Sequence, residues 1–316
     1  MTQLAVITNR GSTRNLRGDN WIEPLLAAES NVAHFWIDGA DQVAEAVQRC
    51  AAVGASVIVV NGGDGTAGLV FAALLNGNAY PSLPALALLP AGKTNMTTAG
   101  WSLKGAPEAA MAAVLRERRL GGLARHAVNR PVLALHQSDD TPPRYGAFFG
   151  AAEIVEGIWF CRKHIYPLKL PNAVSHTAAA ALLLWRGLRA ATNSSDISIR
   201  DGELEIENGS FFVVAVTALD EILLGVRPDA AVTGSASAPL HYMSLRTGPR
   251  AILGAIPNLA RRRFAPGEGR TVRRLERVTL NFTGPYTLDG EIYAAEAGQP
   301  LVLDGSRHLD FIQIPS

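Results

Sequence analysis

The chain has 316 residues, of which 48% are hydrophobic, and its formal net charge is +1. This length and apolar content suit two domains with separate cores, and the near-neutral charge gives no indication of a nucleic-acid partner. The first residues lead directly into a strand without a signal peptide, and the two cysteines lack metal-ligand spacing, which favours a reducing compartment. We therefore expect a cytoplasmic protein.

Strand and helix patterns alternate through the first part of the chain. The expected strands are residues 4–8, 32–37, 57–60 and 83–90, and the expected helices are 21–29, 40–53, 66–75 and 107–120. This alternation is typical of a doubly wound parallel sheet. A polar loop, residues 9–15, follows the first strand at its carboxyl end, which is where ligands bind in such sheets.

After Gly121 and Gly122 the pattern changes to short strands, which indicates a mostly β second domain, a sandwich or a barrel, with the sandwich preferred. A single convincing helix, residues 178–191, interrupts these strands. We expect an α/β nucleotide-binding domain at 1–122, a β-rich domain at 123–300, and C-terminal strands at 301–316 whose sheet the pattern leaves open. The expected strands of this part are 128–135, 145–149, 197–199, 204–206, 211–218, 278–282 and 286–288.

A glycine-rich turn follows the apolar strand at 57–60. It reads Gly62-Gly63-Asp64-Gly65-Thr66 and leads into a helix. Glycine can take positive φ and lets an anion come close, and the helix adds its positive dipole end, so the turn predicts a phosphate site. Asp64 could bind magnesium or accept a proton from an attacking hydroxyl. The alternative is an ordinary glycine turn with Asp64 as a helix N-cap.

Three motifs in order resemble the diacylglycerol kinase catalytic-domain family, which includes bacterial lipid kinases and sphingosine and ceramide kinases. They are Gly62-Gly63-Asp64-Gly65-Thr66, the segment at 89–95, and Leu288-Asp289-Gly290-Glu291. The resemblance implies an α/β domain like those of NAD kinase and diacylglycerol kinase, and a β-rich lipid domain. It also implies magnesium-dependent transfer of the ATP γ-phosphoryl group to a lipid hydroxyl, such as that of diacylglycerol or a sphingoid base, in the cleft between the domains.

The resemblance also implies the roles of individual residues. Asp64 and Glu291 would be the catalytic carboxylates, with either as proton acceptor, and Asp64 would also engage Mg²⁺. Replacing either by alanine is expected to reduce transfer without unfolding the protein. Taken alone, the segment at 288–291 is also explained as a β-turn. The residues that would bind ATP are Asn9, Ser12, Gly62, Gly63, Gly65, Thr66, Lys93, Thr94, Asn95 and Asp289.

The chain departs from the family pattern at several positions. The second motif is usually Pro-Leu-Gly-Thr-x-Asn-Asp, whereas here Lys93 stands at the threonine and Met96 at the aspartate. Arg10 stands where a proline is common, and the segment at 228–237 lacks the Asp-Asp-Gly that holds a structural magnesium. Two alternatives therefore stay open: a kinase of a soluble hydroxyl substrate such as NAD, and an inactive nucleotide- or lipid-binding protein.

Residues 250–277 contain eight arginines, and an apolar segment at 251–259 lies among them. The segment is either an amphipathic element that faces anionic lipid head groups or a solvated loop and edge strand. No apolar run approaches the ~20 residues that a spanning helix needs. We therefore expect the lipid substrate to be met by peripheral contact at the inner membrane face, and the sequence leaves a homodimer open.

Overall fold

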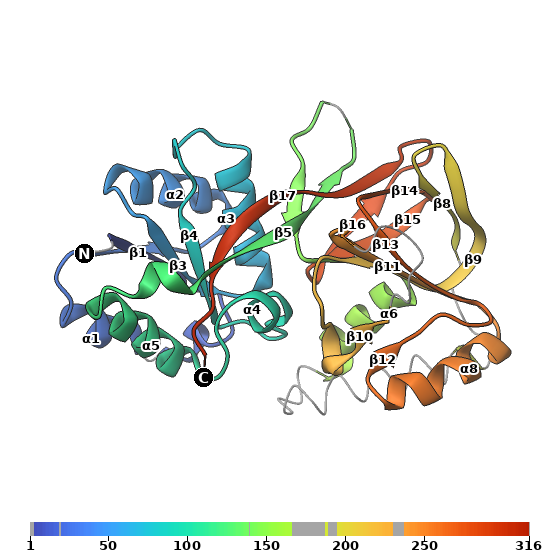
Figure 1. Ribbon diagram of the computed structural model, residues 1–316, viewed down its shortest axis with the longest axis horizontal. Helices are drawn as coiled ribbons and strands as arrows, with labels where there is room; N and C mark the ends of the chain where they lie inside the picture. Colours follow the sequence, from blue (N-terminus) through green and yellow to red (C-terminus); the bar gives the residue numbers. More distant parts are fainter. Residues whose placement is uncertain are drawn as a thin grey trace. The chain divides into compact units, whose positions relative to one another are not determined.

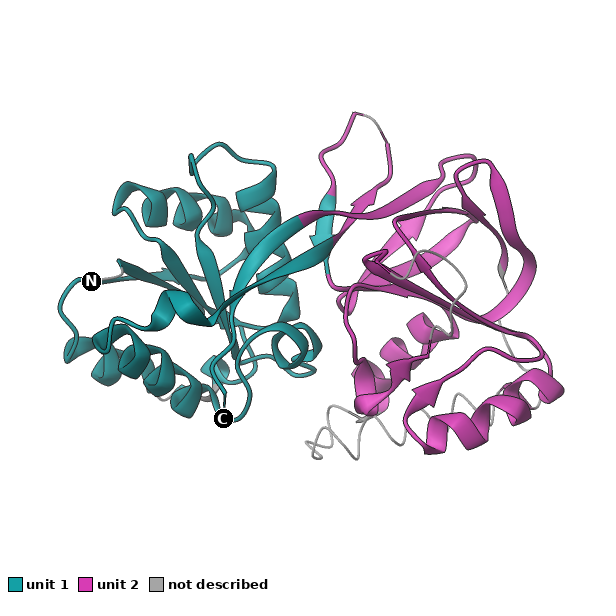
Figure 2. Cartoon of the chain, viewed as in Figure 1, with its two compact units in different colours: residues 1–132, 144–146, 308–316 teal, residues 133–143, 147–307 magenta. Residues whose placement is uncertain are grey.

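A computed structural model describes residues 3–18, 20–138, 140–165, 187–188, 195–229 and 237–315. The chain divides into two compact units (Figure 2). Unit 1 comprises residues 1–132, 144–146 and 308–316, and unit 2 comprises 133–143 and 147–307. The chain passes from one unit to the other within β5 (Ala127–His136) and β17 (Leu301–Ile312), and again on either side of residues 144–146. The domain limits expected at residues 122 and 300 stay predictions.

Unit 1 is built around a parallel sheet with the strand order β4-β3-β1-β2. Both faces are covered, by α2 and α3 on one side and by α1 and α5 on the other (Figure 1), so the strands are mostly apolar. Phe311 of β17 pairs in parallel with Leu86 of β4. The elements are β1 (Leu4–Asn9), α1 (Ile22–Ala27), β2 (Val32–Ile37), α2 (Val43–Ala52), β3 (Val57–Gly62), α3 (Asp64–Leu75), β4 (Ala85–Pro90), α4 (Met96–Trp101) and α5 (Pro107–Arg119).

The strands and long helices expected in unit 1 are present. Two differences affect the site. Helix α3 begins at Asp64 instead of Thr66, and α4 was not predicted. Helix α4 has only six residues, too few to give a periodic signal, and its first amides donate to a residue far away in the sequence, so only the tertiary structure makes it a helix.

Unit 2 is mostly antiparallel β structure. The strand order is β16-β15-β7-β9-β8-β14-β17, and β9 also pairs with β11, which pairs with β13. The strands are β7 (Phe148–Ala152), β8 (Ser195–Asp201), β9 (Leu204–Thr217), β11 (Leu240–Arg246), β13 (Arg270–Leu275), β14 (Arg277–Asn281), β15 (Gly284–Leu288) and β16 (Glu291–Ala295), with a separate parallel pair, β10 (Arg227–Pro228) and β12 (Arg263–Phe264). The helices are α6 (Glu153–Phe160) and α8 (Pro249–Ala260), and a π-helical turn, η4 (Cys161–Ile165), continues α6.

The predicted fold class, an α/β nucleotide-binding domain followed by a mostly β domain, is confirmed. Several predicted boundaries in the second part were wrong. The runs at 204–206 and 211–218 form one strand, β9, and the run at 145–149 is split between β6 (Arg144–Gly146) and β7. The terminal runs at 301–303 and 311–314 belong largely to one strand, β17, which pairs with β14 and β4.

Helices α6 and α8 of unit 2 were not predicted as helices. Helix α8 contains Gly254 and Pro257, both weak helix formers, and it is held by packing of Ile252 and Ala255 against the sheet. The helix expected at 178–191 lies outside the described residues except for Gly187 and Leu188. Within the described ranges, no helix is long and apolar enough to cross a membrane.

Candidate functional site

Three loops of unit 1 meet at the carboxyl ends of β1, β3 and β4, because parallel strands end at the same edge of a sheet. The Asn9 side chain at the end of β1 donates to Thr66 Oγ1 in the first turn of α3, with an N···O distance of 2.8 Å. The Arg14 amide donates to the Ala91 carbonyl after β4 at 3.0 Å. The motifs at 9–15, 62–66 and 91–95 are therefore brought together as one group of loops.

The glycines of the turn serve close packing. A Cβ on Gly62 would lie 2.6 Å from Cβ of Thr66, and one on Gly92 would lie 2.6 Å from Cα of Gly63. None of Gly62, Gly63 and Gly65 has a positive φ, so the freedom of glycine to take positive φ is not used here. At Gly63 and Gly92 the backbones of two loops touch, and at Gly62 the Thr66 side chain fills the space, so none of these three positions has room for a Cβ.

Asp64 lies in the first turn of α3, but its carboxylate binds the next helix. Its two oxygens accept the backbone N–H groups of Met96, at 3.0 Å, and Thr97, at 3.1 Å, at the start of α4. The residue is only 8% exposed. Burial raises the pKa of the Asp64 carboxyl, and the amides of Met96 and Thr97 oppose this shift. Asp64 thus holds the β4–α4 loop against the glycine turn.

The β4–α4 loop is shaped by Asn95, which has φ of 52°. Its Oδ1 accepts the Gly92 N–H at 2.7 Å, and its Nδ2 donates to the carbonyls of Gly92 and Pro90. The side-chain amide of Asn95 therefore forms hydrogen bonds within its own loop. The neighbouring Lys93 is half-buried, and Thr94 is exposed. Lys93 and Thr94 stay predicted phosphate ligands.

Ser12 Oγ and Asn61 Oδ1 are among the buried polar atoms at this edge that have no hydrogen-bond partner in the described part of the chain. Buried polar groups are normally satisfied, so such atoms are candidates for contact with a bound ligand. Ser12 was among the predicted site residues, whereas Asn61 was missed. A signal was available, because Asn61 is the polar residue that ends the buried apolar strand β3.

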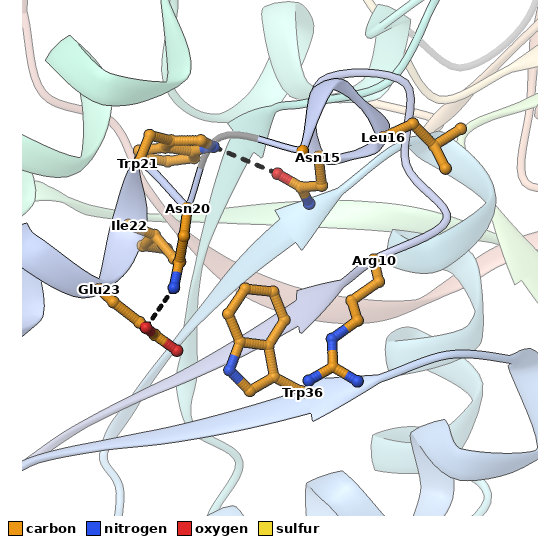
Figure 3. Close-up of a pocket in the computed structure, with 9 residues that line it drawn as sticks. Arg10, Asn15, Leu16, Asn20, Trp21, Ile22, Glu23 and Trp36 are labelled. Carbon is orange, nitrogen blue, oxygen red and sulfur yellow. Dashed lines mark hydrogen bonds between the residues drawn. The ribbon is translucent and has the colours of Figure 1, made fainter.

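A pocket of about 410 Å³ lies beside these loops in unit 1 (Figure 3). Trp36 at the end of β2 forms one wall, and the Arg10 guanidinium lies 4.8 Å from its ring centroid. Trp21 forms another part of the wall and donates to Asn15 Oδ1. Asn15 also donates to the Asn9 carbonyl at 2.7 Å, so the pocket adjoins the loops that hold Asn9. The sequence pattern did not indicate this pocket.

The second carboxylate motif forms the β15–β16 hairpin of unit 2. Asp289 and Gly290 are its two turn residues, with φ of 50° and 90°, which is the left-handed pair of a type I′ turn. The Asp289 carboxylate accepts the N–H groups of Ala147 and Phe148 at 2.9 to 3.1 Å. The β-turn interpretation therefore describes the geometry, and Asp289 fastens the hairpin to the start of β7.

Glu291 follows the turn, and its environment differs from that of Asp289. Its side chain is 59% exposed, and Oε2 lies 3.6 Å from Nη2 of Arg162, in the π-helical turn after α6. The same Nη2 donates to the Gly290 carbonyl at 2.8 Å. Arg162 was not predicted to take part in the site. Asp64 lies in unit 1 and Glu291 in unit 2, so their joint action stays a prediction.

The family resemblance implies a magnesium ion, and the side chains present show whether the protein could hold one. Among the described residues, no three His, Cys, Asp or Glu side chains group as a metal site. Asp64 is the predicted ligand, and both of its oxygens already accept amides. Mg²⁺ is commonly held by one or two carboxylates together with substrate phosphates. The residues therefore fit an ion that arrives with the nucleotide better than a resident ion.

Comparison with known proteins agrees with this architecture. A search of curated proteins gave no match. Two solved structures from Bacillus anthracis strain Sterne, a proposed diacylglycerol kinase and a diacylglycerol kinase, have TM-scores of 0.68 and 0.63 at 15% and 14% identity. Each alignment covers 99% of this chain and 97% of the other. At this identity the likeness shows the fold.

An NAD kinase from Archaeoglobus fulgidus in complex with ATP has a TM-score of 0.46 at 11% identity, over 98% of this chain and 93% of that one. Residues 3–121 match the family model of the diacylglycerol kinase catalytic domain. This range contains the three connected loops of unit 1. The resemblance seen in the motifs is therefore confirmed, and over residues 3–121 the chain carries a domain of the diacylglycerol kinase catalytic-domain family.

Proposed function

We propose that this protein is a lipid kinase that transfers the γ-phosphoryl group of ATP to the hydroxyl of a lipid such as diacylglycerol or a sphingoid base. The observation that carries the proposal is the junction of the β1, β3 and β4 loops, joined by Asn9 and Thr66, inside the matched kinase domain. Loops at this edge of a parallel sheet, with a helix N-terminus, suit a polyphosphate.

The nucleotide would lie across this junction. Ser12 Oγ and Asn61 Oδ1 are buried polar atoms without a hydrogen-bond partner among the described residues, and Lys93 adds a positive charge in the next loop. The pocket of about 410 Å³ lined by Trp21 and Trp36 offers aromatic surface of the size that a purine base needs. Mg²⁺ bound with the nucleotide would neutralise phosphate charge, and Asp64 is the predicted protein ligand.

Of the two predicted carboxylates, Glu291 is the better candidate for proton acceptor. Both oxygens of Asp64 accept backbone amides in a buried setting, whereas Glu291 is exposed beside Arg162. In the step, the lipid hydroxyl oxygen bonds to the γ-phosphorus and the bond to the β–γ bridging oxygen breaks, so ADP leaves. The hydroxyl proton passes to the Glu291 carboxylate.

The test is transfer of label from γ-labelled ATP, with Mg²⁺, to a panel of diacylglycerol, monoacylglycerol, sphingosine, ceramide and NAD. We expect label in one organic-phase product. Label in NAD would replace the proposal by the kinase of a soluble hydroxyl. ATP binding without label in any acceptor would contradict kinase activity on these substrates and favour a binding protein with this fold.

A further inference from the structure

One face of unit 2 exposes large apolar side chains next to arginines, and we call it the α8 surface. The apolar members come from α8 and from the 3-10 turn η6 (Leu223–Gly225). Leu253 is 53% exposed, and the other three are 36 to 39% exposed. The α8 surface consists of Leu223, Leu224, Arg227, Arg250, Leu253, Ile256, Arg261, Arg262 and Arg263.

Helix α8 has more apolar surface than its packing requires. Ala251, Ile252 and Ala255 are buried in a core with β11 and β13, and they anchor the helix. Leu253 and Ile256 point away from that core and are exposed. An amphipathic helix needs one apolar face to pack in a soluble domain, so the second apolar group is available for another contact.

The turn η6 adjoins the C-terminal end of α8. Arg227 pairs with Arg263 in the β10–β12 ladder, and a Cβ on Gly225 would meet the Arg262 side chain at 3.4 Å. Ile222 and Val226, on either side of η6, pack against the same core as α8. The exposed Leu223 and Leu224 therefore belong to the same part of the unit as the arginines at 261–263.

Backbone strain coincides with this surface. Leu224 has φ of 62° and Arg262 has φ of 56°, a left-handed conformation that is unfavourable for residues other than glycine. Leu224 is 39% exposed, so the strain does not serve to bury its side chain. At Arg262 this conformation ends α8, directly after its C-cap, whereas at Leu224 no helix end accounts for it, and strain of this kind is found at functional sites.

The charge on this surface is unbalanced. Segments 221–229 and 249–263 contain five arginines and two carboxylates. The two carboxylates are occupied, because Glu221 pairs with Arg227 and Asp229 pairs with Arg263. No ion pair is formed within the described part of the chain by Arg250, Arg261 or Arg262. Three guanidiniums thus remain beside the exposed leucines and isoleucine.

We propose that the α8 surface docks on an anionic lipid bilayer, with Leu223, Leu224, Leu253 and Ile256 entering the head-group region and the arginines meeting lipid phosphates. An apolar helix face flanked by arginines suits a fluid anionic interface. The proposal deepens the proposed function by naming the surface from which a bilayer-resident acceptor would be reached. Docking itself does not depend on catalysis.

The test is flotation of the full chain with phosphatidylcholine vesicles, with and without about a third of phosphatidylglycerol. We expect binding to the anionic vesicles only, weakened by salt. The variant Arg250→Gln/Arg261→Gln should bind roughly 20- to 30-fold more weakly, since each arginine near an anionic surface contributes about a factor of five. Leu253→Gln/Ile256→Gln should also lose binding, at any salt concentration.

Matched controls lie at the far end of the same unit, near the β8–β9 turn (Figure 1). Leu204 is 63% exposed and Arg277 is exposed, so Leu204→Gln/Arg277→Gln removes one residue of each kind there and should bind normally. Circular dichroism should show all variants folded. Equal binding by the α8 variants and the controls, or binding of wild-type protein to heparin but not to anionic vesicles, would overturn the proposal.

The same samples separate this proposal from the proposed function. Phosphoryl transfer to a short-chain, water-soluble diacylglycerol measures the kinase without a bilayer, and the α8 variants should retain it. Vesicle binding that depends on α8 without transfer to any acceptor would contradict the kinase and leave the docking surface standing. Transfer without vesicle binding would contradict the docking surface alone.

Discussion

The β3–α3 turn of unit 1 and the β15–β16 hairpin of unit 2 both contain an Asp-Gly pair. In both, the aspartate accepts two backbone amides from another loop: Asp64 from Met96 and Thr97, and Asp289 from Ala147 and Phe148. The regions differ in what lies beside the aspartate. In unit 2 an exposed carboxylate, Glu291, follows, whereas unit 1 offers buried polar atoms and amides.

This difference indicates that the aspartate of such a motif can be a structural anchor, and the proposed chemistry falls to its neighbours. An aspartate suits the anchor because its short side chain places two acceptor oxygens close to the backbone of an adjacent loop. The prediction that alanine at Asp64 would leave the fold intact now needs revision, since two buried amides would lose their acceptor.

The largest expected effect is on the rate of transfer. Glu291→Gln removes the proposed proton acceptor and keeps the shape, so transfer should fall roughly 10²- to 10⁴-fold. The thermal midpoint should stay unchanged, because the side chain is 59% exposed. Steady-state transfer and thermal denaturation of the same preparation measure both quantities. Near-normal turnover would show that the base is another group.

The next effect is on stability. Asp64→Ala leaves the amides of Met96 and Thr97 without their acceptor in a buried setting, which should lower the free energy of unfolding by about 2–4 kcal/mol. Asp64→Asn keeps one acceptor oxygen and should lose less. Urea unfolding measures the difference.

Asp289→Ala is the counterpart in unit 2 and should also destabilise the protein. If Asp64→Ala had wild-type stability and only its transfer rate were lost, the anchor role of Asp64 would be refuted. Wild-type stability for both variants would remove the parallel between the two regions.

A smaller effect is expected for Arg162, which contacts both the Gly290 carbonyl and Glu291. Arg162→Ala should lower kcat by roughly 10- to 100-fold through misplacement of Glu291, with little change in KM for ATP. Arg162→Lys should restore part of kcat. Lys163→Ala, the adjacent basic residue of the same turn, is the control and should behave like wild type. A kcat for Arg162→Ala equal to that of the control would exclude a positioning role.

The smallest expected effect is a pH dependence of stability that arises at His34 in unit 1. Burial lowers the pKa of His34, with Glu23 opposing and Arg10 adding to the shift, and the ring is hydrogen-bonded to Thr8 at 2.9 Å. A lowered pKa favours the neutral ring in the fold. The contribution to stability is therefore present above the usual pKa of 6.5 and is lost as pH falls through the lowered value. Urea unfolding should show that the wild-type protein loses stability between about pH 7.5 and pH 5.5, and that His34→Gln loses less over the same range. An equal loss in the variant would rule out His34 as the source of this pH dependence.

Much of unit 1 could be predicted from local pattern. The strands at 4–9 and 57–62 begin with continuous apolar runs, 4–7 and 57–60, because a sheet buried on both faces favours apolar residues, and their polar residues come only at the carboxyl ends. Unit 2 was harder. Strand β9 contains Gly209 at φ of 128°, which looks like a break in sequence, and α8 contains Gly254 and Pro257. In both cases tertiary pairing and packing override the local preference.

The sequence by itself determined the order of the motifs and the residue types at each loop, and the resemblance of these motifs indicated the family of the first domain. The strands and helices of unit 1 could be predicted because the spacing of apolar residues follows from strand and helix geometry. Only the tertiary structure decided which polar groups are engaged. Asp64 and Asp289 became anchors because their oxygens meet amides distant in sequence, and Arg162 entered the site by contacts that no local pattern shows. Such contacts depend on the packing of distant segments, which local sequence preferences do not determine.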